Sequence, residues 1–299
     1  MTVDGAESTA EELEAQAHAL AALSTRPQAA EATAPAAALR SASDLLRAID
    51  RASGRTIRDF QRQPLRRAAA TAALVCARAS RLRATSEACW LTRAETEARA
   101  AGDRALQALV SLERATAEGQ AARSADAPSP ATVHHATVAL HQAGSGHGGA
   151  GIRAAARFHL AWEFAARGDR HGAIVEIDAG RIDAQRAGWS EPAIDACVGS
   201  ALRKLGRLTG AEPALSGALD GPPSRTTWVL CDLARVHAAM GDVDMGGQAL
   251  EEAFLLTTAD GMRARLPRIV AARSVLPPGR ALRELDDVLR SARDERPGD

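Results

Sequence analysis

The stretch Trp228–Leu256 decides the fold, and it reads WVLCDLARVHAAMGDVDMGGQALEEAFLL. Residues suited to one helix face, most of them apolar or small, recur three or four positions apart on both sides of Gly241-Asp242; they are Leu230, Leu233, Ala234 and His237 before this pair and Gly246, Leu250, Ala253 and Phe254 after it. This spacing places each set on one face of a helix. Because the Gly-Asp pair separates two such helices, the stretch predicts an αα-hairpin. One hairpin cannot bury its apolar faces alone, so we expect it to stack on similar hairpins.

Two further glycines indicate copies of this hairpin. Gly168-Asp169 repeats the turn, and Gly206 lies between the two turns, at separations of 38 and 35 residues. These separations are slightly longer than the 34-residue period of tetratricopeptide repeats. Upstream, where the pattern is weaker, we expect further turns at Arg83 and Gly119.

The residues around the three glycine turns agree in size and polarity. A small residue follows each turn by five positions, a branched aliphatic residue by nine, and another small residue by twelve. An aliphatic residue precedes each turn by eight positions and a small residue by seven. In that order the residues are Ala173, Ala211 and Gly246; Ile177, Leu215 and Leu250; Gly180, Ala218 and Ala253; Leu160, Val198 and Leu233; and Ala161, Gly199 and Ala234. The small residues predict close helix–helix contacts.

The composition also favours helices packed through small side chains. Apolar residues make up 46% of the 299 residues, but aromatic residues make up only 3%, so alanine and leucine must fill most of the core. The formal net charge is zero, so we expect no general attraction to nucleic acid or membranes. Lys204 is the only lysine among 37 lysine and arginine residues, and tyrosine is absent. We interpret this usage as the coding bias of a GC-rich genome, such as that of an actinobacterium.

The sequence predicts a cytoplasmic protein. Its N-terminus lacks the basic and apolar regions of a signal peptide, and no apolar run approaches the ~18 residues of a membrane-spanning helix. The four cysteines form no closely spaced pair; they are Cys76, Cys89, Cys197 and Cys231. We therefore expect buried thiols in a reducing compartment.

Residues 1–40 differ from the rest of the chain. We interpret them as an Ala-rich tail, disordered or partly helical near Glu11–Leu23, because this composition buries little apolar surface. Residues 41–299 form the predicted repeat domain, and a glycine-rich loop at 143–151 is expected between its N-terminal and C-terminal sets of repeats. A last hairpin is expected at 262–275 and 280–293, with the charged outer face of a capping helix.

Three runs carry a family resemblance. The run ACWLTRAETEARAAGDRALQAL at Ala88–Leu109 resembles the first sensor repeat of actinobacterial helix-turn-helix regulators of the Xre type. The runs at Asp232–Asp242 and Arg280–Arg290 are similar to the C-terminal part of the same tetratricopeptide-like region. The resemblance implies a right-handed solenoid of αα-hairpins over roughly residues 64–293, acting in transcriptional or developmental regulation. It also assigns Phe164, Leu202 and His237 to the aromatic position of the repeat.

The chain departs from that family at its N-terminus. A DNA-binding helix-turn-helix needs two helices across a tight turn and a basic recognition helix, and residues 1–62 do not supply them. We therefore expect no direct contact with nucleic acid.

The resemblance also implies a ligand site. The first helix of each resembled hairpin lines a concave groove, with groove positions thirteen, ten, six, three and two residues before the turn. Carried onto this sequence, these positions give Phe158, Trp162, Ser200, Arg203, Lys204, Trp228, Cys231 and Arg235. Aromatic and cationic side chains on one strip suit an acidic or C-terminal peptide. Gap-filling between repeats is the alternative role for the two tryptophans.

A histidine-rich segment beside the glycine loop raises the question of a metal site. It contains His134, His135, His141 and His147, but only Asp126 could add a carboxylate ligand. We therefore expect solvated histidines, and neither a metal nor a cofactor. The loop also lacks the Lys-Ser/Thr pair of a phosphate-binding loop.

The sequence thus predicts a non-enzymatic, tetratricopeptide-like binding module that recognises a peptide, protein or small ligand in its groove. Three alternatives stay open: a self-associating homodimeric scaffold without a ligand, an intact regulator with a cryptic N-terminal DNA-binding segment, and an enzyme or accessory protein that uses the histidine segment. We expect no membrane partner.

Overall fold

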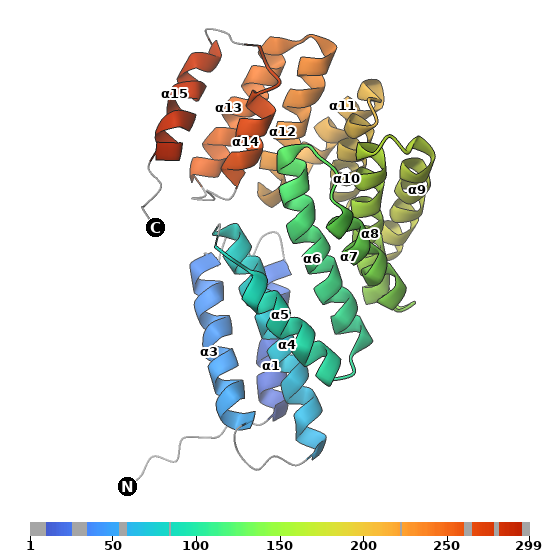
Figure 1. The fold of residues 1–299 in the computed structure, drawn as a ribbon, viewed down its shortest axis with the longest axis vertical. Helices are drawn as coiled ribbons and strands as arrows, with labels where there is room; N and C mark the ends of the chain where they lie inside the picture. The colour runs from blue at the N-terminus through green and yellow to red at the C-terminus, as the bar shows by residue number, and fades with distance from the viewer. Residues whose placement is uncertain are drawn as a thin grey trace. The chain divides into compact units, whose positions relative to one another are not determined.

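A computed structural model describes residues 10–25, 35–53, 59–83, 85–221, 223–259, 265–277 and 281–294. Every regular element within these ranges is helical, which confirms the predicted all-α class. The elements, shown in Figure 1, are α1 (Ala10–Thr25), α3 (Pro35–Ser53), α4 (Asp59–Leu82), α5 (Ala88–Ala100), α6 (Arg104–Ala125), α7 (Pro130–Gln142), α8 (His147–Ala166), α9 (Arg170–Arg186), α10 (Glu191–Lys204), α11 (Leu208–Gly217), the short 3-10 helix η1 (Ala218–Asp220), α12 (Pro223–Met240), α13 (Val243–Ala259), α14 (Leu266–Arg273) and α15 (Ala281–Asp294). None of the described helices has the length and apolar character needed to cross a membrane.

The chain divides into two compact units. The first comprises residues 1–114 and 138–152, and the second comprises residues 115–137 and 153–299. Helices α6, α7 and α8 contribute residues to both units. The predicted glycine loop at 143–151 belongs entirely to the first unit, and its second half is helical because α8 begins at His147.

The core of the first unit is built around α4. Helices α1, α3 and α5 all pack on it, and the α4 residues from Ala68 to Ala77 are buried without interruption. Ten consecutive buried residues exceed one face of a helix, so α4 is covered on all sides. Most of them are alanine, which lets the neighbouring helices approach closely.

Helix α1 corrects the prediction for residues 1–40. The expected helix near Glu11–Leu23 is present as α1, but the expectation that this segment buries little apolar surface is wrong. Leu13 and Ala17 are only 3% and 0% exposed and belong to the same core as α3 and α4. Their four-residue spacing places both on the face that packs against α4. The rest of the predicted tail before Pro35 lies outside the described residues.

A buried carboxylate joins α4 to α6 in the first unit. Glu113 accepts ion-pair contacts from Arg78, at 2.6 Å, and from Arg81, at 3.0 Å. Burial opposes ionisation, but the two arginines outweigh it and hold the pKa of Glu113 below its usual range. The group is therefore ionised and paired at neutral pH.

The three glycine turns of the second unit form as predicted. Gly168, Gly206 and Gly241 have φ angles of 78°, 73° and 86°, in the left-handed region that favours glycine after the last helical residue. Two of the turns continue with an aspartate that caps the next helix. Asp169 Oδ1 accepts a hydrogen bond from the Gly172 amide at 2.9 Å, and Asp242 Oδ1 from the Met245 amide at 3.2 Å.

In each turn, the position that the resemblance assigned to an aromatic residue has a role in the backbone hydrogen bonding. The carbonyl groups of Phe164, Leu202 and His237 accept hydrogen bonds from the backbone N–H groups of Asp169, Arg207 and Asp242, at 2.9 to 3.0 Å. These six-to-one bonds are the Schellman pattern that closes a helix C-terminus. The backbone of this position therefore fixes the turn, whatever its side chain.

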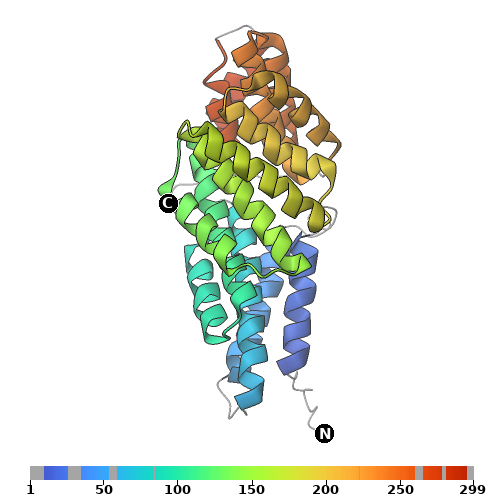
Figure 2. The same ribbon diagram turned by 90° about the vertical axis from the view of Figure 1, so that its right-hand side faces the viewer.

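The repeated positions around the turns are all buried, as the pattern predicts. Three of them are glycine, and each lies close to a neighbour. A Cβ on Gly199 would lie 2.7 Å from Leu215 Cγ, and a Cβ on Gly180 would lie 3.0 Å from the Phe158 ring. A Cβ on Gly246 would lie 2.9 Å from Leu276 Cδ2. Small residues thus bring α10 against α11, and α8 against α9. Figure 2 shows the helices of the second unit, from yellow-green to orange, as successive ribbons.

The expected turn at Gly119 is wrong. Gly119 is buried inside α6, and a Cβ there would lie 3.0 Å from His159 Nδ1. This glycine is therefore small because a side chain of α8 packs on it. The true turn precedes α6 at Gly102, which has a φ of 64°, and Asp103 Oδ1 accepts the Leu106 amide hydrogen bond at 3.0 Å. The expected turn at Arg83 is confirmed, since α4 ends at Leu82.

Replacing Leu13 tests whether α1 belongs to the folded core. We expect Leu13→Ala to lower the free energy of unfolding of the first unit by about 2–4 kcal/mol, because it removes a fully buried side chain. Gln16→Ala, an exposed position on the same helix, should change it by less than about 0.5 kcal/mol. Urea unfolding followed by circular dichroism measures both; equal effects would contradict the packing of α1.

Two glycines in one hairpin test the close approach of α10 and α11. We expect Gly199→Ala to destabilise the second unit by about 1–3 kcal/mol, because its Cβ would collide with Leu215. Gly210→Ala is the matched control, since its Cβ would meet only Leu202 Cδ1 at an ordinary 3.5 Å; alanine there should be neutral or stabilising. Tryptophan fluorescence during urea unfolding measures the difference, and a harmless Gly199→Ala would refute the close approach.

Candidate functional site

A cavity of about 270 Å³ lies within the second unit, among α6, α8, α10, α12 and α14. One phenylalanine and three tryptophans contribute to its walls, together with polar, charged and small side chains. The lining residues are Thr116, Gln120, Arg123, Ala155, Phe158, His159, Trp162, Trp189, Cys197, Ser200, Trp228 and Arg268. We call this space the tryptophan cavity. An apolar pocket with a few convergent polar groups is the usual form of a small-molecule site.

The rings of the cavity are held by one another and by cations. The ring centroids of Phe158 and Trp189 lie 6.0 Å apart with a tilted geometry, within the range of favourable aromatic pairs. Two cations lie over the ring of Trp162, with the Arg123 guanidinium 5.8 Å and the Lys204 ammonium 5.5 Å from its centroid. The Arg268 guanidinium lies 5.3 Å from the ring centroid of Trp228. These cation–π contacts fix the orientation of both indoles.

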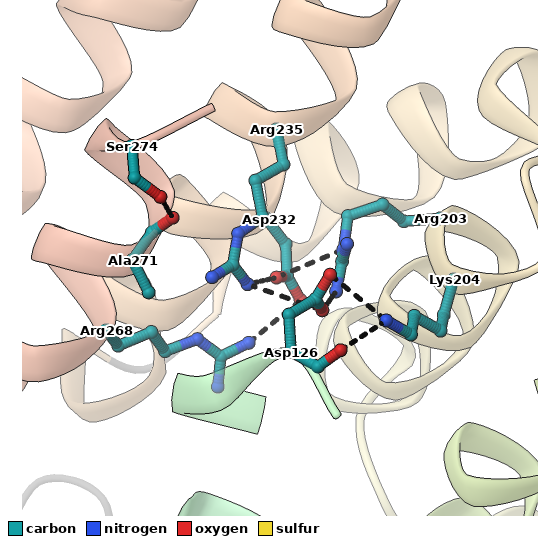
Figure 3. A network of polar contacts seen from close by, with 8 residues as sticks. All are labelled: Asp126, Arg203, Lys204, Asp232, Arg235, Arg268, Ala271 and Ser274. Carbon is teal, nitrogen blue, oxygen red and sulfur yellow. Dashed lines mark hydrogen bonds and ion pairs between the residues drawn. The ribbon is translucent and has the colours of Figure 1, made fainter. Parts of the chain in front are cut away.

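Next to the cavity, Asp232 is shared by three arginines (Figure 3). Asp232 Oδ1 lies 3.2 Å from Arg203 Nε and 3.6 Å from the nearer terminal nitrogen of Arg235. Asp232 Oδ2 accepts a hydrogen bond from Arg268 at 2.9 Å. The carboxylate is fully buried, which would raise its pKa, but Arg268, Arg203 and Arg235 outweigh burial and hold the pKa of Asp232 well below its usual range.

A second carboxylate, Asp126, covers the outer side of the same cations. It follows the last residue of α6 with a left-handed φ of 51°, and it lies 3.1 Å from Arg203 and 3.0 Å from Lys204. The Asp126 carbonyl also accepts a hydrogen bond from Lys204 Nζ at 2.8 Å. We call Asp126, Arg203, Lys204, Asp232, Arg235 and Arg268 the charge cluster. The ion pairs of this cluster connect the C-terminal end of α6 to α10 and α12.

The eight predicted groove residues divide into two groups. Phe158, Trp162, Ser200 and Trp228 come together in the lining of the tryptophan cavity. Arg203, Lys204 and Arg235 lie in the charge cluster instead, where the side chains of Arg203 and Arg235 are only 7% and 4% exposed. Cys231 lies in neither, because it is fully buried in the core formed by α12, α13 and α14; burial raises the pKa of its thiol to about 12.

The expectation that the cationic residues form an open strip is therefore wrong for Arg203 and Arg235. Both arginines lie within ion-pair distance of Asp232 and Asp126, residues that the groove pattern did not include. The groove pattern also does not include Arg123, Arg268 and Trp189, which line the cavity. Asp232 carried one signal, since an aspartate three residues before an arginine on an otherwise apolar helix face needs a partner.

The histidine segment differs from the cavity in its surroundings. His134 is exposed, and its ring lies 5.1 Å from that of His135 in an edge-to-face arrangement. Within the described residues, no group of three or more His, Cys, Asp or Glu side chains comes close enough to hold a metal ion. The side chain of His147 lies outside the described residues.

Comparisons with known proteins add no family to this description. No model of a known protein family matches the chain. A search of curated proteins likewise finds no match.

Replacing Asp232 tests the charge cluster. We expect Asp232→Asn to cost about 3–5 kcal/mol of stability, because it leaves three buried arginines without their shared counter-charge. Asp287→Asn, which removes an exposed partner of Arg290, should cost less than about 1 kcal/mol. Urea unfolding at pH 7, followed by tryptophan fluorescence, compares the two; similar small losses would contradict the shared role of Asp232.

The lowered pKa of Asp232 also predicts that the stability of the fold depends on pH in the acidic range. Because its folded-state pKa is depressed, Asp232 stabilises the fold fully above ~4, the unfolded pKa, and loses this contribution as pH falls towards the folded pKa. Wild-type stability should therefore fall more steeply below pH 4 than that of Asp232→Asn. Unfolding curves measured between pH 2 and pH 7 test this, and parallel pH profiles would refute it.

Proposed function

We propose that this chain is a non-enzymatic, tetratricopeptide-like binding module with a regulatory role, and that its ligand site is the tryptophan cavity. The single observation that carries the proposal is the convergence of Phe158, Trp162, Ser200 and Trp228 on one cavity. These residues come from three successive hairpins and occupy the groove positions that the resemblance to tetratricopeptide repeats implies. Regulation in transcription or development rests on the resemblance of Ala88–Leu109 to the sensor region of Xre-type regulators.

The dimensions of the cavity favour one of the three expected ligand classes. A volume of about 270 Å³ lies at the lower end of small-molecule pockets, whereas a folded protein partner buries roughly 800 Å² of each surface. The cationic residues that would read an acidic peptide on an open groove are already paired with Asp126 and Asp232. A small ligand is therefore the proposal.

The lining also supports a mechanism. Five helices contribute side chains to one cavity, so a bound ligand would contact several hairpins at once. Hairpins that share a ligand lose freedom to move against each other, and the ligand favours whichever arrangement it fits best. The resulting change in the helical array is the signal that the module would transmit to its partner.

A cavity-filling variant tests this function. We propose a titration of the full chain with small bicyclic aromatic compounds that are neutral, cationic or anionic, followed by tryptophan fluorescence. At least one should bind saturably. Ser200→Leu, which enlarges a buried side chain of the lining, should weaken that binding by at least tenfold.

Ser216→Leu is the matched control, because Ser216 is exposed on α11, away from the cavity lining, and it should bind as the wild type does. Saturable binding that Ser200→Leu leaves unchanged would place the ligand elsewhere. The absence of any saturable binder would contradict the proposed function itself.

A further inference from the structure

Two arginines distinguish the tryptophan cavity from a purely apolar pocket. Arg123, on α6, and Arg268, on α14, are both part of its lining. Each guanidinium already stacks over an indole, Arg123 over Trp162 and Arg268 over Trp228. The cavity therefore offers aromatic surfaces with a cation beside each of two tryptophans.

Positive charge exceeds negative charge around the cavity. Within the described residues, five cations gather there: Arg123, Arg203, Lys204, Arg235 and Arg268. The facing carboxylates with lowered pKa are Asp126 and Asp232, and both oxygens of each are already engaged by the charge cluster. A buried excess of cations is costly unless an anion compensates it.

The remaining titratable groups near the cavity do not remove this excess. Glu163 is buried on α8, accepts a hydrogen bond from the Ser129 amide at 2.7 Å and lies 3.9 Å from Arg167. Even when it is ionised, the five cations face only three carboxylates. His159 and Cys197 also line the cavity. The ring of His159 contacts Thr116 at 3.2 Å and Arg123 at 3.4 Å.

Arg123 is the least compensated of the cations. Among the described residues it forms no ion pair within 4.0 Å, and its side-chain contacts are with His159 and Trp162. Burial and the nearby charge of Arg268 lower the pKa of Arg123 to about 10, so it stays charged at neutral pH. The two guanidinium groups thus repel one another across a space that an anion could occupy.

We propose, on the basis of the function proposed above, that the tryptophan cavity binds a small aromatic carboxylate, with its rings among Trp162, Trp189 and Trp228 and its carboxylate beside Arg123 and Arg268. Guanidinium groups match the geometry of a carboxylate with paired N–H donors. The aromatic walls require an apolar body, which a simple inorganic anion lacks, and the cavity volume limits that body to one or two rings.

A pair of probes that differ only in charge tests this inference. Isothermal titration calorimetry with 2-naphthoate and with 2-naphthamide compares an anion with a neutral molecule of the same shape. We expect the wild-type chain to bind the carboxylate at least tenfold more tightly than the amide, and this preference to weaken with added salt. Equal affinities would overturn the anion inference while leaving the cavity as a ligand site. Binding of neither probe at millimolar concentration would overturn both.

Variants of Arg123 test whether its charge recognises the carboxylate of the probe. Because Arg123 forms no ion pair among the described residues, Arg123→Gln should leave the fold intact, which circular dichroism checks. It should weaken 2-naphthoate binding at least tenfold and 2-naphthamide binding by much less, because Arg123 also orients the Trp162 ring, and Arg123→Lys should restore part of the loss. Arg181→Gln, which removes a half-exposed arginine of α9, should change neither affinity. Equal losses for both probes in Arg123→Gln would overturn the assignment.

Discussion

Close contact between helices at small residues is the constraint on which this structure depends. With only 3% aromatic residues, the chain fills its cores with alanine, and neighbouring helices must approach until glycine or alanine alone fits between them, as at Gly199 against Leu215. The left-handed glycines at the turns keep that contact in register, because each turn fixes where the next helix begins. A larger residue at either kind of position would separate the helices.

The few large aromatic residues gather where this close packing is interrupted. Three of the four tryptophans, Trp162, Trp189 and Trp228, line one cavity, and the charge cluster lies directly beside it. Asp232 gives the arginines of α10, α12 and α14 a common buried partner. The cluster thus holds the cavity walls in place while leaving Arg123 and Arg268 facing the space. Arg268 takes part in both, since it pairs with Asp232 and lines the cavity, whereas Arg123 lines the cavity without an ion pair among the described residues.

Much of the fold follows from local patterns. The Gly-Asp turns and the burial of small residues around them follow from residues within a few positions of each turn, and these predictions are confirmed. Half of the predicted site, Phe158, Trp162, Ser200 and Trp228, meets in the cavity because register sets which helix face points inward. Arg203 and Asp126, by contrast, are 77 residues apart, so no local sequence pattern predicts their ion pair. The prediction of a turn at Gly119 is wrong because close helix packing and turns both favour glycine.

The central claim is that the tryptophan cavity receives a small aromatic carboxylate between two arginines. A crystal structure of the full chain grown with 2-naphthoate tests it most directly. The account predicts density for the rings among the three tryptophans, with both carboxylate oxygens within hydrogen-bond distance of the guanidinium groups of Arg123 and Arg268. An empty cavity in crystals saturated with the probe, or a probe whose carboxylate points away from both arginines, would contradict it.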